Sequence, residues 1–135
     1  MKVLFDINVV LDIVGSRRPF YEDSRSAFLK VIESGGEPYL AIHAYPTIYY
    51  LLGAASTRAK RKSAMEWVFD SFSVAGAGQR ELANARSLDM PDFEDALVAS
   101  AALSAGCDLI LTRNVDDFSA SPEKAITPLA YLSRE

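Results

Sequence analysis

Asp6 is a carboxylate at the end of an apolar run, where an acid needs an explanation. It follows the segment KVLF, and Asn8 comes two residues later. Burying a charged carboxylate beside such a run costs several kcal/mol, by rough estimate, unless a partner or a cation compensates the charge. Further acids gather in two later segments, PDFEDAL and TRNVDDF. These acids are Asp92, Glu94, Asp95, Asp116 and Asp117.

Several carboxylates in one cleft would favour a divalent cation. Like charges raise each other's pKa, so such a cluster persists where partners or a cation neutralise it. Magnesium takes one or two protein carboxylates and leaves room for phosphate oxygens. A site of that kind suits phosphodiester hydrolysis. Zinc prefers clustered His and Cys ligands, and the chain has one of each. The sequence therefore favours a hard cation held by carboxylates.

Simpler roles remain open for each acid taken singly. Asp6 could cap a helix that follows the first strand. Asp92 and Glu94 fit a helix start, where acids complement the macrodipole. Asp116 and Asp117 could be turn residues, and Asp12 is expected to cap a helix or face solvent. Only the convergence of the acids would distinguish a site from these roles.

The elements that must position these acids alternate between strands and helices. Strands are expected in KVLF, PYLAIHA, FSVAGAG, CDLILT and the start of AITPLAYL. Apolar spacing predicts helices in YEDSRSAFLKVIESGG, YPTIYYLLGAAS, TRAKRKSAMEWVFDSF, QRELANARSL, PDFEDALVASAALSAG and the end of AITPLAYL. This alternation predicts an α/β fold with a parallel sheet and helices on both faces.

In parallel sheets, ligands bind beyond the carboxyl ends of the strands. Asp6 ends the first strand, and TRNVDD follows the strand through Ile110. If both strands are central, their carboxyl ends carry several polar side chains to one edge, and Asp95 could point into the same cleft. The other residues expected there are Asn8, Thr112, Asn114 and Asp117.

Composition favours one domain over residues 1–135, with half of the residues apolar and about a quarter charged. The net charge is −4, but it would be +2 without the six acids named first, so acidity does not exclude a nucleic-acid partner. No apolar run approaches a membrane span of about 20 residues, and no signal peptide is visible. The lone Cys107 lies in an apolar run and fits a reducing, cytoplasmic compartment.

Three segments together resemble a known family. VLFDINVVLDI, PDFEDALVASAALSAGCDLILTRNVDDF and TPLAYL resemble the PIN domains, with the greatest likeness to the VapC-type ribonucleases, toxins of type II toxin–antitoxin pairs. The resemblance covers essentially the whole chain. It implies a three-layer α/β/α sandwich with a parallel sheet of about five strands. It also implies Mg²⁺ or Mn²⁺ dependence, RNA cleavage, a homodimer and an antitoxin protein partner.

The family's acids carry over position by position. The resemblance implies catalytic, metal-binding roles for Asp6, Asp95 and Asp117. Supporting roles fall to Asn8, Thr47, Thr112, Asn114, Asp116 and Asp92. Thr47 is a departure, because the family usually has a Glu at that position. A Thr hydroxyl can hold a metal-bound water but brings no charge to a cation, which weakens the expected site.

Two functions of different kinds follow for a PIN domain, and a third comes from another family. The first is a ribonuclease whose RNA path uses Arg17, Arg18, Arg58, Lys60, Arg61, Lys62 and Arg113. The second is a catalytically weakened module that binds RNA or antitoxin. The third, a phosphatase of the haloacid-dehalogenase type, is disfavoured because Asn8 stands where that chemistry needs a second Asp.

Overall fold

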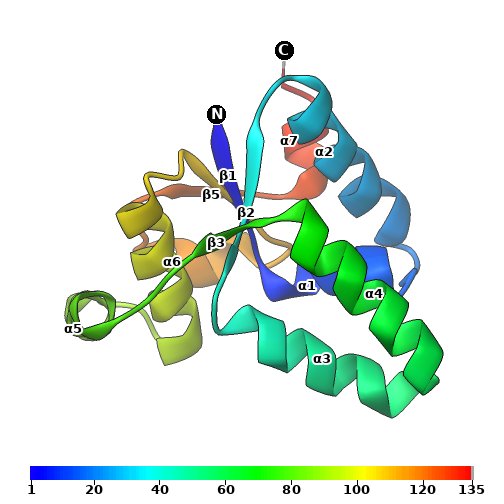
Figure 1. The fold of residues 1–135 in the computed structure, drawn as a ribbon. Coiled ribbons are helices and arrows are strands. Elements are labelled where there is room, and N and C mark those ends of the chain that lie inside the picture. The colour runs from blue at the N-terminus through cyan, green and yellow to red at the C-terminus, as the bar shows by residue number, and fades with distance from the viewer. Residues whose placement is uncertain (135) are drawn as a thin grey trace.

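Five short parallel strands form one sheet in the order β3-β2-β1-β4-β5 (Figure 1). The structure is a computed structural model that describes residues 1–134. The strands are β1 (Lys2–Phe5), β2 (Glu37–Ala41), β3 (Ser73–Ala75), β4 (Leu109–Leu111) and β5 (Lys124–Ile126). Val3, Leu4 and Phe5 of the central strand have no exposed surface. Parallel strands covered on both faces carry continuous apolar runs, as β1 does from Val3 to Phe5.

Helices cover both faces of the sheet. They are α1 (Ile7–Val14), α2 (Tyr21–Glu33), α3 (Ala44–Ala55), α4 (Arg58–Ser71), α5 (Gln79–Ser87), α6 (Phe93–Ala105) and α7 (Pro128–Leu132), with a 3-10 helix η1 (Val115–Phe118). α1 to α4 and α7 share one core with one face of the sheet, and α6 packs on the other face with α5 beside it (Figure 1). The predicted α/β/α sandwich with five parallel strands is confirmed.

The two faces are packed in different ways. Phe5 meets Phe28 and Phe72 edge to face, with ring centroids 5.8 and 5.4 Å apart. On the opposite face, α6 buries Ala99 and Ala102 without exposed surface. Such small side chains let the helix lie close to the strands. α6 therefore holds the acids at its amino end in a fixed place relative to β1.

The carboxyl ends of β1 and β4 meet at the point where the strand order changes direction. From β1 the chain continues to β2 and β3 on one side, and later crosses to β4 and β5 on the other. Asp6 is the only residue between β1 and α1, and its backbone N–H donates to the carbonyl of Leu111 at 2.9 Å. Asp6 thus stands at the switch point, where open parallel sheets bind their ligands.

Asp12 does not face solvent or cap a helix, so that expectation is wrong. It has no exposed surface. Its carboxylate pairs with Arg17 at 3.0 Å and Arg113 at 2.9 Å, and it accepts a 3.1 Å hydrogen bond from the hydroxyl of Ser24. The physical reason is that the segments after α1 and β4 bring two guanidinium groups to this carboxylate, which compensates its burial.

Replacing Asp12 with Asn is expected to lower the free energy of unfolding by on the order of 3 kcal/mol, because two guanidinium groups would lose their counter-charge. Urea unfolding measures this. Asp70→Asn, at an exposed position on α4, is the matched control and should stay within about 0.5 kcal/mol of the parent. An Asp12 variant as stable as the control would show that the buried ion pairs contribute nothing.

Candidate functional site

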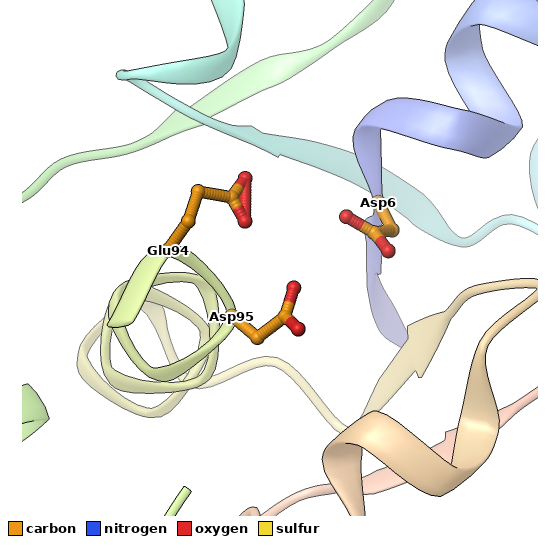
Figure 2. A group of neighbouring side chains, drawn as sticks. All are labelled: Asp6, Glu94 and Asp95. Atoms are coloured by element: carbon orange, nitrogen blue, oxygen red, sulfur yellow. The ribbon is translucent and has the colours of Figure 1, made fainter. Parts of the chain in front are cut away.

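Three carboxylates from two distant segments come together at the switch point. Asp6, Glu94 and Asp95 each offer an oxygen within 4.8 Å of the others. Figure 2 shows Asp6 at the start of α1, with Glu94 and Asp95 reaching towards it from the first turn of α6. Within residues 1–134 this is the one group of three or more acidic, His or Cys side chains with that spacing.

Asp6 is held by several hydrogen bonds although it is only 6% exposed. Its Oδ1 accepts from the backbone N–H of Ile7 at 2.9 Å and thereby caps α1. Its Oδ2 accepts from the hydroxyl of Thr112 at 2.8 Å and from the side-chain amide of Asn8 at 3.3 Å. The cap role and the place in the carboxylate group are therefore both true of one side chain.

Burial and like charge act against ionisation of this group. Burial raises the pKa of Asp6 above its usual value, and the charge of Glu94 adds to the effect, while the hydrogen bond from Thr112 opposes it. Burial, together with the charges of Glu94 and Asp6, raises the pKa of Asp95 from 3.8 to about 7. Burial and like charge together therefore favour a proton on Asp95 up to about pH 7 when no metal is bound.

Glu94 and His43 are residues that the sequence reasoning did not select. Glu94 was interpreted as an acid at a helix start that complements the macrodipole. At the first turn its longer side chain nevertheless reaches the group. Nε2 of His43 lies 3.5 Å from Oε1 of Glu94. The available clue was position, because His43 is the first side chain able to bind a metal after the strand segment PYLAI.

The other predicted acids and supporting residues are not members of the group. Asp92 caps α6 by accepting the backbone N–H of Asp95 at 3.0 Å. The backbone N–H of Asn114 donates to the Thr112 hydroxyl at 3.0 Å. Asp116 and Asp117 are exposed in η1, and the three-carboxylate group does not include them.

Thr47 is not a member of the carboxylate group. It is exposed, and its hydroxyl donates to the backbone carbonyl of His43 at 3.2 Å, one helical turn earlier in α3. The bond satisfies the hydroxyl inside the helix. The position that the family usually fills with an acid therefore brings no charge to this group.

The predicted RNA-binding cations fall into two sets. Arg17 and Arg113 bind Asp12, and Arg18 makes an exposed pair with Glu22 at 3.8 Å. The second set lies on α4. Its members are Arg58, Lys60 and Lys62, which are exposed, and Arg61, whose guanidinium stacks 4.1 Å above the ring of Tyr49. The α4 cations make no ion pair within the described part of the chain, so their charges are open to a partner.

Residues 2–116 match the family model described as the PIN domain, and the chain belongs to the PIN-domain family. Its fold is also that of chains in three solved complexes. VapBC2 from Rickettsia felis bound to promoter DNA has 12% identity and a TM-score of 0.72, covering 94% of this chain and 98% of that one. VapBC-1 from nontypeable Haemophilus influenzae has 13% identity and a TM-score of 0.71, and the match covers 96% of this chain and 99% of that one. FitAcB from Neisseria gonorrhoeae has 16% identity and a TM-score of 0.70, and the match covers 94% of this chain and 98% of that one.

The family match confirms the resemblance to PIN domains, and the structural likenesses show a shared fold. No curated protein matches the sequence. Within residues 1–134, no helix has the length and apolarity that crossing a bilayer requires.

The stability of the metal-free protein is expected to fall as pH rises from about 4 to about 7. Folded Asp95 keeps its proton until about pH 7, whereas the unfolded chain releases it near 3.8. The folded state therefore binds the extra proton in this window, and raising the pH removes that advantage.

Urea unfolding in EDTA at pH 5 and pH 8 tests this expectation. Asp95→Asn should lose much of the pH dependence and be the more stable protein at pH 8, whereas Asp70→Asn should keep the parent's dependence. A parent and an Asp95 variant with equal pH dependence would contradict the proposed repulsion.

Proposed function

We propose that this chain is a metal-dependent endoribonuclease and the toxin of a toxin–antitoxin pair. The observation that carries the proposal is the group of Asp6, Glu94 and Asp95 at the switch point of a PIN domain. The half-buried Asp95, with its pKa raised to about 7, is a perturbed acid of the kind that clusters at functional sites.

The donor set fits Mg²⁺ or Mn²⁺. Both are hard cations that prefer oxygen ligands, and the three side chains offer oxygens within 4.8 Å of one another. Asp6, Glu94 and Asp95 would hold the cation, and Asp117 stays proposed as a further acid from the segment after β4. Asp116 and Asn114 are alternatives to it there. Such a cation polarises a phosphodiester and lowers the pKa of an attacking water.

The chain's own residues prepare the site in two ways. Thr112 and Asn8 both donate to Oδ2 of Asp6, which fixes the direction of this buried carboxylate. The Asp92 carboxylate accepts the backbone N–H of Asp95 and so fixes the first turn of α6, from which Glu94 and Asp95 project. Preorganised carboxylates of this kind need little rearrangement to bind a cation.

RNA is the proposed substrate, and its backbone would run over basic side chains. The α4 cations named above are the main candidates. Arg17, Arg18 and Arg113 form the second candidate set, of which Arg17 and Arg113 pair with Asp12 of α1. Contacts with phosphates give affinity that depends on salt and little on sequence. The proposed antitoxin partner rests on the likeness to chains of VapBC and FitAcB complexes. Assembly as a homodimer and a cytoplasmic location are part of the same proposal.

Thr47 supports a second candidate, a catalytically weakened PIN fold that only binds RNA or antitoxin. Its hydroxyl bonds within α3 and brings no charge to the carboxylate group. Against this candidate, an idle site gains nothing from keeping repelling carboxylates with a raised pKa at its centre. Metal binding separates the two functions.

Millimolar Mn²⁺ or Mg²⁺ is expected to raise the melting temperature, because a cation that binds only the folded state stabilises it by about 2.7 kcal/mol at 100 times its dissociation constant. Asp6→Asn should lose most of this shift and most Mn²⁺-dependent RNA cleavage, since it keeps the shape but not the charge. Without metal the variant should melt at the same temperature or higher. RNA cleavage by Asp6→Asn at the parent rate would exclude Asp6 as a ligand.

Changing Arg58, Lys60, Arg61 and Lys62 together to Gln is expected to weaken RNA binding and flatten its salt dependence, because fewer phosphates are neutralised. Fluorescence anisotropy with a labelled RNA at several salt concentrations measures both. The matched control is Arg80→Gln with Arg86→Gln, exposed cations on α5 across the sheet. Equal effects of the two variants would place the RNA path elsewhere.

A further inference from the structure

His43 lies beside the carboxylate group at the carboxyl end of β2, next to the central strand. It is the N-cap of α3 and follows β2 by two residues. Its Nε2 is 3.5 Å from Oε1 of Glu94, and the two side chains are 23% and 42% exposed. His43 also acts on Asp6, since its charge would favour the ionised carboxylate. Its position thus couples the end of β2 to the site.

Both ring nitrogens of His43 are buried and have no hydrogen-bond partner. Buried polar atoms without partners are rare in folded proteins, and each one asks for a reason. The 3.5 Å separation from Glu94 is an ion-pair distance, longer than the usual range of about 2.7–3.2 Å for an N–H···O hydrogen bond. Hydrogen bonds in functional sites are often long until the site is occupied, and then tighten.

Glu94 needs such a partner more than Asp6 does. Asp6 is fixed by Thr112, Asn8 and the N–H of Ile7. Glu94 has a longer side chain and is 42% exposed. His43 is the cation-forming side chain paired with it in the described part of the chain.

We infer that His43 is a positioning residue that donates Nε2–H to Oε1 of Glu94 and holds this carboxylate towards Asp6 and Asp95. The inference rests on the proposed metal site. α3 then contributes to the centre through His43, one turn before Thr47, where the resemblance leads one to expect an acid. Outer partners of metal-binding carboxylates typically change metal affinity by about 10–100-fold.

Two substitutions separate positioning from packing. His43→Phe keeps a ring of similar size but removes the donor, and His43→Gln places an amide nitrogen near the position of Nε2. The first should raise the Mn²⁺ dissociation constant by about 10–100-fold, and the second should restore most of the affinity. The metal-free melting temperature of the Phe variant should be unchanged or higher, because two unpartnered buried nitrogens are removed. Calorimetric titration with Mn²⁺ and a melting scan in EDTA measure these quantities.

A second measurement does not depend on the folding of any His43 variant. The chain contains a single His, so its ring N–H signals in an NMR spectrum are unambiguous. In the Mg²⁺-loaded parent we expect an Nε2–H proton protected from exchange with water. Glu94→Leu, which removes the acceptor, should lose this protection, whereas Glu66→Leu, at an exposed position on α4, should keep it.

The outcomes are distinct. Phe-variant affinity equal to that of the parent, or an unprotected Nε2–H in the Mg²⁺-loaded parent, overturns the role of His43 and leaves the metal site standing. A parent protein that binds neither Mn²⁺ nor Mg²⁺ overturns the metal site and this inference with it. Loss of affinity in the Phe variant, recovery in the Gln variant and a protected Nε2–H establish the positioning role.

Discussion

Repulsion between carboxylates at the end of the central strand is the constraint around which this protein is arranged. The fold brings Asp6 together with Glu94 and Asp95, although burial and like charge raise the pKa of Asp95 to about 7. Two hydrogen bonds hold the segments that carry these acids. The backbone bond from Asp6 to Leu111 ties β1 to β4, and the Asp92 side chain caps the start of α6. The packing of α6 on the sheet through alanines completes this hold. Such strain persists only where surrounding structure over-determines it.

Asp12 is a buried carboxylate whose charge is compensated by side chains of the chain itself. Arg17 and Arg113 supply the counter-charge, and Arg113 also stacks 4.0 Å from the ring of Phe20. Both arginines also contact Asn8, whose amide donates to Asp6. The ion cluster therefore orders the segments on either side of the carboxylate group. Stability and site geometry share these residues.

Much of the fold was readable from local patterns, whereas the membership of the site was not. Alternating apolar segments and Gly106, which ends α6 with a φ of 76°, predicted the parallel sheet and the helices other than α1 and η1. Asp6 and Asp95 could be placed because strand ends converge. Glu94 and His43 depend on side-chain reach across elements, and burial of Asp12 depends on two arginines from other segments. These contacts join different elements, so the spacing of residues within one segment cannot predict them.

Asp6 and Asp12 lie at the two ends of the same short helix, and both are buried acids. Their surroundings differ in sign. Asp12 has two guanidinium groups within 3.0 Å, so its charge is balanced by the chain. Asp6 has neutral donors and two further carboxylates around it. Burial raises its pKa and the charge of Glu94 adds to the rise, while the hydrogen bonds from Thr112 and Ile7 oppose it. A carboxylate balanced by its own chain is complete as it stands, whereas one surrounded by like charge requires a cation or a proton from outside. Both acids are buried, so the sign of the surroundings separates the acid that the chain itself balances from the acid proposed to bind a cation.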